Sequence, residues 1–182
     1  MKKEATRDRL LTAALALFAE HGYDNTSVSQ IAAHAGVTEM TFFRHFPAKQ
    51  NLLIEDPYDP LIGRAIAEQP VGLDPISRAA RGIRQAWRAL PERSTEEVRM
   101  RLRIVAHTPA LRAGLVRGTE ATEAVIVEAL TAGSASRKDA IVAAGAVMGA
   151  LNAALLEWSV TDGDELGSAI ESAVSVLEAG RG

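Results

Sequence analysis

Residues 31–43 read "IAAHAGVTEMTFF", and this stretch decides the predicted fold. Ala32 is small where two helices would cross, and Gly36 stands four positions later, where a tight turn requires a positive φ angle. Val37 and Phe42 are apolar where a second helix would return to the core. The spacing predicts a helix-turn-helix, although by itself it is as typical of an ordinary corner between two helices.

Flanking signals predict three short helices around this turn. A first helix over about residues 5–21 is indicated by an apolar row at helical spacing, Leu11, Leu15 and Phe18. Ser27 and Gln30 form a capping box at the start of the second helix, and Thr38 is a natural cap for a third over about residues 38–45. The N-terminal part is therefore predicted to be a small helical bundle.

Composition favours an all-α protein throughout. The chain has 182 residues, of which 47% are hydrophobic, and alanine dominates the apolar set. It has no cysteine, which excludes disulfides, zinc-thiolate sites and cysteine nucleophiles and predicts a cytoplasmic protein. Acidic residues interrupt the basic start of the chain, so it does not resemble a secretion signal.

Proline and glycine residues divide the remaining chain into about five longer helices; these residues are Pro75, Pro91, Pro109, Gly133 and Gly163. We place the domain boundary so that residues 1–52 form a three-helix bundle with the helix-turn-helix and residues 53–182 form a larger helical domain. The helix over about residues 75–90 is two-faced. Its basic row is expected to be a solvated face, with contact to an anionic ligand group as the alternative: Arg78, Arg81, Arg84 and Arg88.

The stretch "IVAAGAVMGALNAALL", residues 141–156, is uncharged. It is shorter than the roughly 20 residues that span a membrane, which favours a buried or subunit-packing helix. Small residues recur in it at four-residue spacing and allow close approach of another helix. The predicted dimer interface is Gly145, Gly149, Ala153 and Leu156. The helix over about residues 164–179 is a second candidate for the interface. Packing of the glycine-containing helix within one subunit is the alternative.

Charge is distributed unevenly along the chain. The net charge is −3, yet residues 1–50 carry six basic and five acidic side chains. The net charge argues against nucleic acid as a partner of the whole surface, so any DNA-binding surface must be local and assisted by backbone groups.

The segment "HGYDNTSVSQIAAHAGVTEMTFFRHFPAKQNLL" resembles, over its whole length, the DNA-binding segment of the tetracycline-repressor (TetR) family of bacterial transcription factors. The residues that carry the resemblance are Gly22, Tyr23, Val28, Ile31, Ala32, Ala35, Gly36, Val37, Thr41, Phe42, Phe43, His45, Phe46, Lys49, Leu52 and Leu53. The resemblance covers about the first 55 residues, and the rest fits the family only in length and helical character.

The resemblance implies a homodimer that places the third helix of each subunit in the major groove of a near-palindromic operator. It also implies contacts to base edges from Glu39, Met40 and Thr41. Contacts to phosphates are implied for Ser27, Ser29, Thr38, Phe43, His45 and Lys49, with Arg44 as a further candidate.

Two residues of the third helix are unusual, one because it differs from the family pattern and one because its charge has the same sign as that of DNA. Phe43 stands where relatives commonly have tyrosine, so its contact must be apolar, to a thymine methyl group or a sugar. Glu39 is acidic in a helix that meets a polyanion; it either accepts a hydrogen bond from a cytosine amino group or repels the DNA.

The resemblance implies that the C-terminal domain binds a small effector, which we expect to be hydrophobic. It also implies that the protein is a repressor and that the effector releases it from its operator. Large or polar side chains on apolar helices are candidate ligand contacts, although each also fits a plain core: Trp87, Met100, His107, Met148, Asn152 and Trp158.

Two other function classes remain as alternatives, an enzyme without a recognisable motif and a helical interaction protein. The four histidines show no metal-binding spacing, and the sequence has no glycine-rich phosphate loop or serine elbow. We therefore expect no catalytic residues, no metal and no cofactor. An interaction protein explains the helices but not the dense match in residues 22–53.

Overall fold

The computed structural model describes the chain except residues 1, 55–58, 90–91, 162–164 and 180–182. All regular structure in the described residues is helical, which confirms the predicted all-α class. The helices are α1 (Lys2–His21), α2 (Val28–His34), α3 (Glu39–His45), α4 (Asn51–Ile54), α5 (Asp59–Ala67), α6 (Pro75–Arg88), α7 (Glu92–His107), α8 (Pro109–Ala132), α9 (Arg137–Val160) and α10 (Leu166–Ala179).

The predicted caps and turn around α2 and α3 are confirmed. Ser27 and Gln30 form the capping box of α2, and the Thr38 side chain accepts a hydrogen bond from the Thr41 backbone N–H at the start of α3. Gly36 has φ +66°, and the N–H of Val37 donates to the carbonyl of Ala32 over 2.9 Å. This pattern of bonds ends α2 and directs the chain into α3 at a fixed angle.

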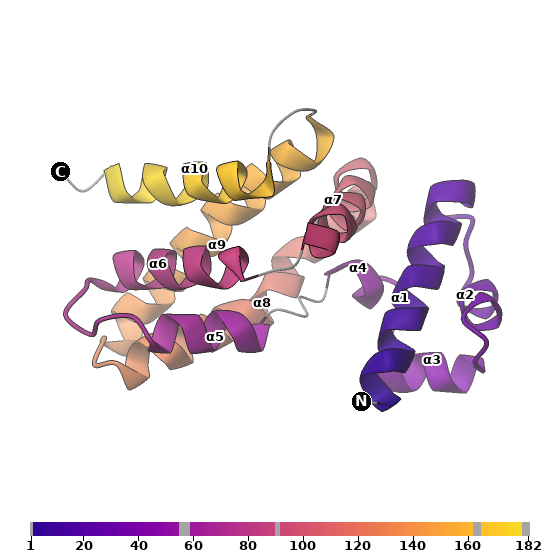
Figure 1. The fold of residues 1–182 in the computed structure, drawn as a ribbon, viewed down its shortest axis with the longest axis horizontal. Coiled ribbons are helices and arrows are strands. Elements are labelled where there is room, and N and C mark those ends of the chain that lie inside the picture. The colour runs from indigo at the N-terminus through magenta and orange to yellow at the C-terminus, as the bar shows by residue number, and fades with distance from the viewer. Residues whose placement is uncertain (1, 55–58, 90–91, 162–164, 180–182) are drawn as a thin grey trace.

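Buried side chains form two hydrophobic clusters. The smaller cluster contains residues of α1, α2, α3 and α4. Its members Phe42, Phe46 and Ile31 are almost inaccessible to solvent. It also includes Val105 of α7 and Leu111 of α8, so the N-terminal helices pack on the larger part of the molecule. Figure 1 shows α4 between the N-terminal helices and the longer C-terminal helices.

Helix α9 is the central element of the larger cluster and packs against α6, α7, α8 and α10. Among the described residues, α9 is also the helix that is long and apolar enough to cross a membrane by length and composition. Val147, Leu151 and Trp158 are buried inside the bundle. The uncharged stretch therefore supplies the core of a helical bundle, and packing explains its apolar character.

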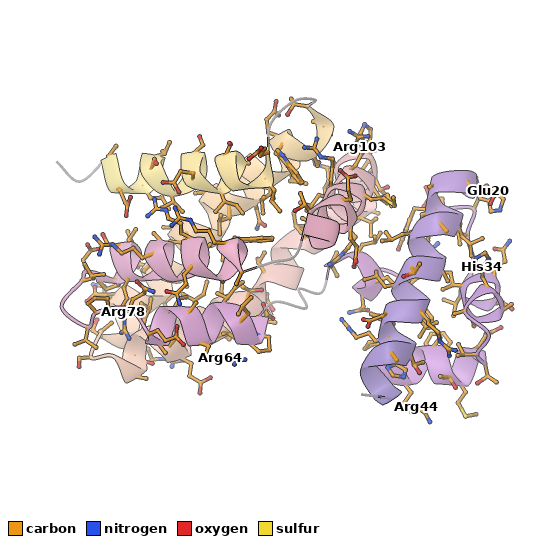
Figure 2. The ribbon with its side chains drawn as sticks, in the orientation of Figure 1. Glu20, His34, Arg44, Arg64, Arg78 and Arg103 are labelled. Atoms are coloured by element: carbon orange, nitrogen blue, oxygen red, sulfur yellow. The ribbon has the colours of Figure 1, made fainter. Side chains whose placement is uncertain are left out.

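The expectation of a solvated arginine face on α6 is wrong for two of its members. Arg78 is 3% exposed, and its guanidinium donates to the carbonyls of Leu130 and Ala67, both over 3.4 Å. Figure 2 shows Arg78 within the bundle. A Cβ atom at Gly133 would meet the Arg78 guanidinium, so a glycine there makes room for the buried charge.

Arg84 is the second exception, because it connects α6 to α10. Its Nε donates to Glu171 over 2.7 Å and its Nη2 to Glu178 over 3.3 Å. Arg81 and Arg88 are exposed as expected, and Leu90, the last residue of the helix predicted over about residues 75–90, lies outside the described residues. Long-range partners decided the burial of this face, and helical periodicity contains no information about them.

Helix α5 was not predicted. It is a nine-residue helix, Asp59–Ala67, whose Ile62, Ala65 and Ile66 are buried against α6 and α8. Its first two residues are the last two of the proline-rich "EDPYDP" stretch, which indicates a break. Its length is also below the roughly 11–18 residues over which a helical apolar period is recognised. Packing against two longer helices stabilises it.

Candidate nucleic-acid interface and effector cavity

The outer face of the helix-turn-helix consists of most of the residues that the resemblance implies at DNA. Met40 is 82% exposed and Phe43 50% exposed, although both side chains are large and apolar. Thr41 and His45 are half-buried, while the remaining helix residues on this face are exposed, namely Glu39 and Arg44. We call this set, residues 39–41 and 43–45, the reading face.

Phe42 and Phe46 point away from the reading face into the core. Phe42 is 0% exposed, and its ring meets that of Phe46 with centroids 5.8 Å apart. Phe46 also lies beneath the Arg7 guanidinium, 4.4 Å from the ring centroid. The two rings, four residues apart, therefore anchor α3 to α1 while the intervening side chains face outward.

Two of the residues that are implied to contact phosphates already form hydrogen bonds with the local backbone. Ser27 accepts from the Gln30 backbone N–H over 3.2 Å, and Thr38 accepts from that of Thr41 over 3.2 Å. The Thr38 and Thr41 hydroxyl oxygens lie 3.0 Å apart and share a hydrogen bond. Ser29, by contrast, is an exposed residue of α2. The two caps fix the helix ends that would face a phosphate backbone.

The Lys49 side chain forms hydrogen bonds within the protein. Its ammonium donates to the carbonyls of Tyr23 and Thr26, each over 2.8 Å, and lies 4.1 Å from the centroid of the Tyr23 ring. Burial lowers the pKa of Lys49 from its ordinary value, and the nearby Asp24 acts in the opposite direction. Lys49 therefore ties the loop before α2 to the start of α4, a structural role that its place in the motif did not reveal.

Arg44 is the exposed cation of the reading face. Figure 2 shows Arg44 at the edge of the N-terminal helices, far from Arg64 of α5. His45, next along the chain, is half-buried, and its carbonyl accepts a hydrogen bond from Arg7 over 3.5 Å. Of these two residues, Arg44 has the exposure that a phosphate contact requires.

An apolar cavity of about 90 Å³ lies where α4 meets the larger bundle. Leu53 and Ile54 of α4 form part of its wall, and α5 to α9 supply the rest. Polar groups in the wall are few: Arg101, Thr119, Thr122 and Asn152. Because pockets for drug-sized ligands usually hold about 300–1,000 Å³, such a ligand enters this cavity only when its walls move apart.

Three of the six candidate ligand residues line this cavity, namely Trp87, Met148 and Asn152. Trp87 also borders an open groove of about 640 Å³ between α6 and α10. The other three lie elsewhere. Met100 is exposed, the His107 ring is hydrogen-bonded to the Arg103 carbonyl over 2.8 Å, and Trp158 is buried beneath the Arg99 guanidinium.

Arg101 is the charged residue of the cavity wall, and sequence reasoning did not select it. It is 8% exposed, and its Nη2 donates to the Leu53 carbonyl at the end of α4 over 3.2 Å. The available signal was its position: Arg101 falls three residues after Val98 and four before Val105, on the buried face of α7. A basic residue in an apolar row indicates a buried partner.

The predicted dimer residues divide into two groups. Gly145, Gly149 and Ala153 are exposed along one side of α9, and a Cβ atom at either glycine would meet nothing within 4 Å. Leu156 is half-buried against the smaller hydrophobic cluster of its own chain. The exposed apolar surface of α9 continues at both ends, where Ile141, Val142 and Val160 are 51%, 61% and 44% exposed.

No group of three or more histidine, aspartate or glutamate side chains in the described part of the chain is arranged to hold a metal ion.

Two family models match the sequence. The model described as bacterial regulatory proteins, tetR family, matches residues 10–55, which contain the helix-turn-helix. The model described as the MftR C-terminal domain matches residues 74–182, more than half of the chain. A similar curated protein is the HTH-type transcriptional regulator TcmR of Streptomyces glaucescens, 30% identical over 138 residues. That alignment covers 72% of this chain and 61% of TcmR, so the chain spans less than two thirds of its relative's length.

Solved structures share the whole fold. The fatty acid degradation regulator FadR of Bacillus halodurans is 20% identical with a TM-score of 0.59, covering 97% of this chain and 96% of FadR. The FadR repressor of Thermus thermophilus, solved in complex with lauroyl-CoA, is 21% identical with a TM-score of 0.53, covering 96% and 94%. At these identities the likeness shows the fold alone.

Proposed function

Because the chain belongs to the tetR family of bacterial regulatory proteins, we propose that it is a transcriptional repressor that binds operator DNA as a homodimer and is released by a small hydrophobic effector. The observation that carries this proposal is the reading face of α3. It is mostly exposed, its helix is anchored to the core through Phe42 and Phe46, and a glycine turn at Gly36 precedes it. A protein of this family is expected to act in the cytoplasm.

The reading face suits the major groove in shape and chemistry. Helix α3 is short, and its start is capped, so its first turn can approach base edges while the exposed ends of α2 and α3 meet the phosphates. The net charge of −3 is unfavourable for DNA as a whole. Binding therefore depends on local contacts such as Arg44 and on backbone N–H groups at helix N-termini.

A dimer supplies a second α3 helix, which can bind the second half-site of the operator. The exposed apolar side of α9, with its two glycines facing open space, is the surface that we assign to the subunit interface. Burial of that side against its own copy would cover residues that otherwise face water, and a two-fold axis makes the same patch serve both subunits.

The cavity provides the route by which an effector acts. Leu53 and Ile54 of α4 form part of its wall, and α4 follows the helix-turn-helix in the chain. A ligand larger than the cavity must move its walls apart, and we assign that movement to α4, whose end Arg101 of α7 contacts at the Leu53 carbonyl. An effector that binds the displaced arrangement better than the DNA-binding one shifts the population away from the operator.

DNA binding is tested by an electrophoretic shift with the intergenic DNA beside the gene, at low salt and without added ligand. We expect a discrete complex at nanomolar to micromolar protein, weakening steeply as salt rises. A chain that shifts neither this DNA nor any duplex selected from a random library would not be a repressor.

The effector site is tested by thermal shift with dodecanoate, 1-dodecanol and lauroyl-CoA, followed by the DNA shift assay with each compound that stabilises the protein. Met148→Trp, which fills the cavity, is expected to abolish stabilisation, whereas Met100→Trp on the exposed side of α7 leaves it unchanged. The melting temperature of Met148→Trp without ligand checks that loss of binding is not loss of fold, and Met148→Ala, which enlarges the cavity, should still be stabilised by the ligands. Equal ligand responses in Met148→Trp and wild type would remove the effector from this cavity.

A further inference from the structure

The reading face contains an apolar pair that the folded subunit leaves largely exposed. Met40 and Phe43 are 82% and 50% exposed, one helical turn apart on α3. The structure describes other large exposed apolar side chains, but they lie in the C-terminal part, at Val71, Met100, Ile141, Val142, Val160 and Val176. Two such side chains on one seven-residue helix therefore require a reason outside the subunit's own packing.

Phe43 is held in place although half of it faces solvent. Its ring meets the edge of the Phe42 ring, with centroids 5.4 Å apart and planes at 84°. Phe42 is itself fully buried, so the contact positions the exposed ring on a rigid base. An aromatic ring that is fixed before binding loses little conformational entropy when it meets a partner.

The chemistry of the major groove limits what such a pair can recognise. The base edges there carry hydrogen-bond donors and acceptors, and the apolar group among them is the C5-methyl of thymine. Neither Met40 nor Phe43 offers a strong hydrogen bond to a base or to a phosphate oxygen. The polar neighbours Thr38 and Thr41 are already hydrogen-bonded to each other.

We propose that Met40 and Phe43 are specificity-determining residues that read thymine methyl groups, so that each operator half-site contains thymine where these two side chains enter the groove. The inference rests on the proposed function, because it requires α3 to lie in the major groove. It assigns sequence preference to apolar contacts, whereas Arg44 and the helix caps supply affinity that does not depend on sequence.

The test removes single methyl groups from the DNA. Duplexes selected by the full-length protein from a random library are resynthesised with one thymine at a time replaced by deoxyuridine, which lacks only the C5-methyl group. Fluorescence anisotropy then measures Kd for each duplex at fixed salt. At one or two thymines per half-site we expect about a fourfold loss of affinity, the equivalent of ~0.8 kcal/mol for one buried methyl group.

Protein variants show which side chain meets each methyl group. Met40→Ala and Phe43→Ala should each bind thymine and uracil duplexes equally at one of the sensitive positions. Phe43→Tyr keeps the ring and should keep the discrimination. Val71→Ala, a matched loss of exposed apolar surface far along the chain, should behave as wild type.

The outcomes separate the two claims. If the library yields no bound duplex, the proposed function fails and the inference fails with it. If duplexes are bound but no deoxyuridine substitution matters, or if the alanine variants retain the full discrimination, DNA binding stands and the assignment of Met40 and Phe43 is overturned.

Discussion

Lys49 illustrates how a single residue can be placed correctly in a motif and still have an unexpected contact. Its position suits a phosphate contact, yet its ammonium donates to two backbone carbonyls and lies over the Tyr23 ring. These bonds join segments 23 and 26 positions away in sequence. A hydrogen bond that involves a charged group contributes about 1.5–3 kcal/mol, less where water competes.

Lys49→Met should therefore destabilise the folded protein, by about 1–2 kcal/mol because the side chain is half-buried. Urea unfolding followed by circular dichroism measures the change. Lys138→Met on the exposed first turn of α9 is the matched control and should alter stability by less than about 0.5 kcal/mol. Equal stability of the two variants would show that the carbonyl contacts of Lys49 contribute nothing measurable.

Arg44 leads to a different prediction at the same scale. Arg44→Ala should weaken binding to specific and random duplexes alike and reduce the slope of log Kd against log salt by about one, because one phosphate contact is lost. Arg64→Ala, at an exposed position of α5 that is distant from Arg44 in Figure 2, should leave both quantities unchanged. An Arg44→Ala variant that altered sequence preference but not the salt slope would place Arg44 at a base.

At the scale of elements, short sequence patterns predicted the helix caps and turns well, but they did not predict the long-range contacts. The caps at Ser27 and Thr38 and the turn at Gly36 depend on neighbours within four residues, so the sequence is sufficient to identify them. The burial of Arg78 depends on carbonyls 11 and 52 positions away, and the Arg101 contact to α4 spans 48. Such pairs are not encoded in any short pattern.

The same distinction applies to the candidate site. The reading face follows from a dense local motif, whereas the cavity is assembled from short stretches of α4 to α9. Three of the six proposed ligand residues reach its wall. All six were selected as large or polar side chains on apolar helices, a property that distinguishes a cavity neither from a core, as at Trp158, nor from exposed surface, as at Met100.

The contact between α5 and α6 depends on a glycine. A Cβ atom at Gly82 would lie 2.6 Å from the Ile66 Cα and 2.7 Å from its backbone nitrogen, so the two helix backbones touch. Gly82→Ala should force the helices apart and lower the free energy of unfolding by about 1–3 kcal/mol. Gly167→Ala on α10, where nothing lies within 4 Å, should be neutral or mildly stabilising in the same denaturant titration. Unchanged stability in Gly82→Ala would show that α5 moves freely on α6.

For the whole molecule, the proposed dimer decides whether two reading faces act together. Ala153→Arg places a charge on the exposed apolar side of α9 and should convert the dimer to monomer in light scattering coupled to size exclusion. Val71→Arg, also on exposed surface, should remain dimeric. A dimeric Ala153→Arg variant would place the interface on another surface.

Hydroxyl-radical footprinting of the selected duplex, with stoichiometry measured on the same complex, tests the proposed function most directly. Two subunits per duplex should protect two half-sites whose centres are about one helical turn, ~34 Å, apart or slightly more. A single protected site, or uniform protection without half-sites, would contradict binding by a pair of α3 helices.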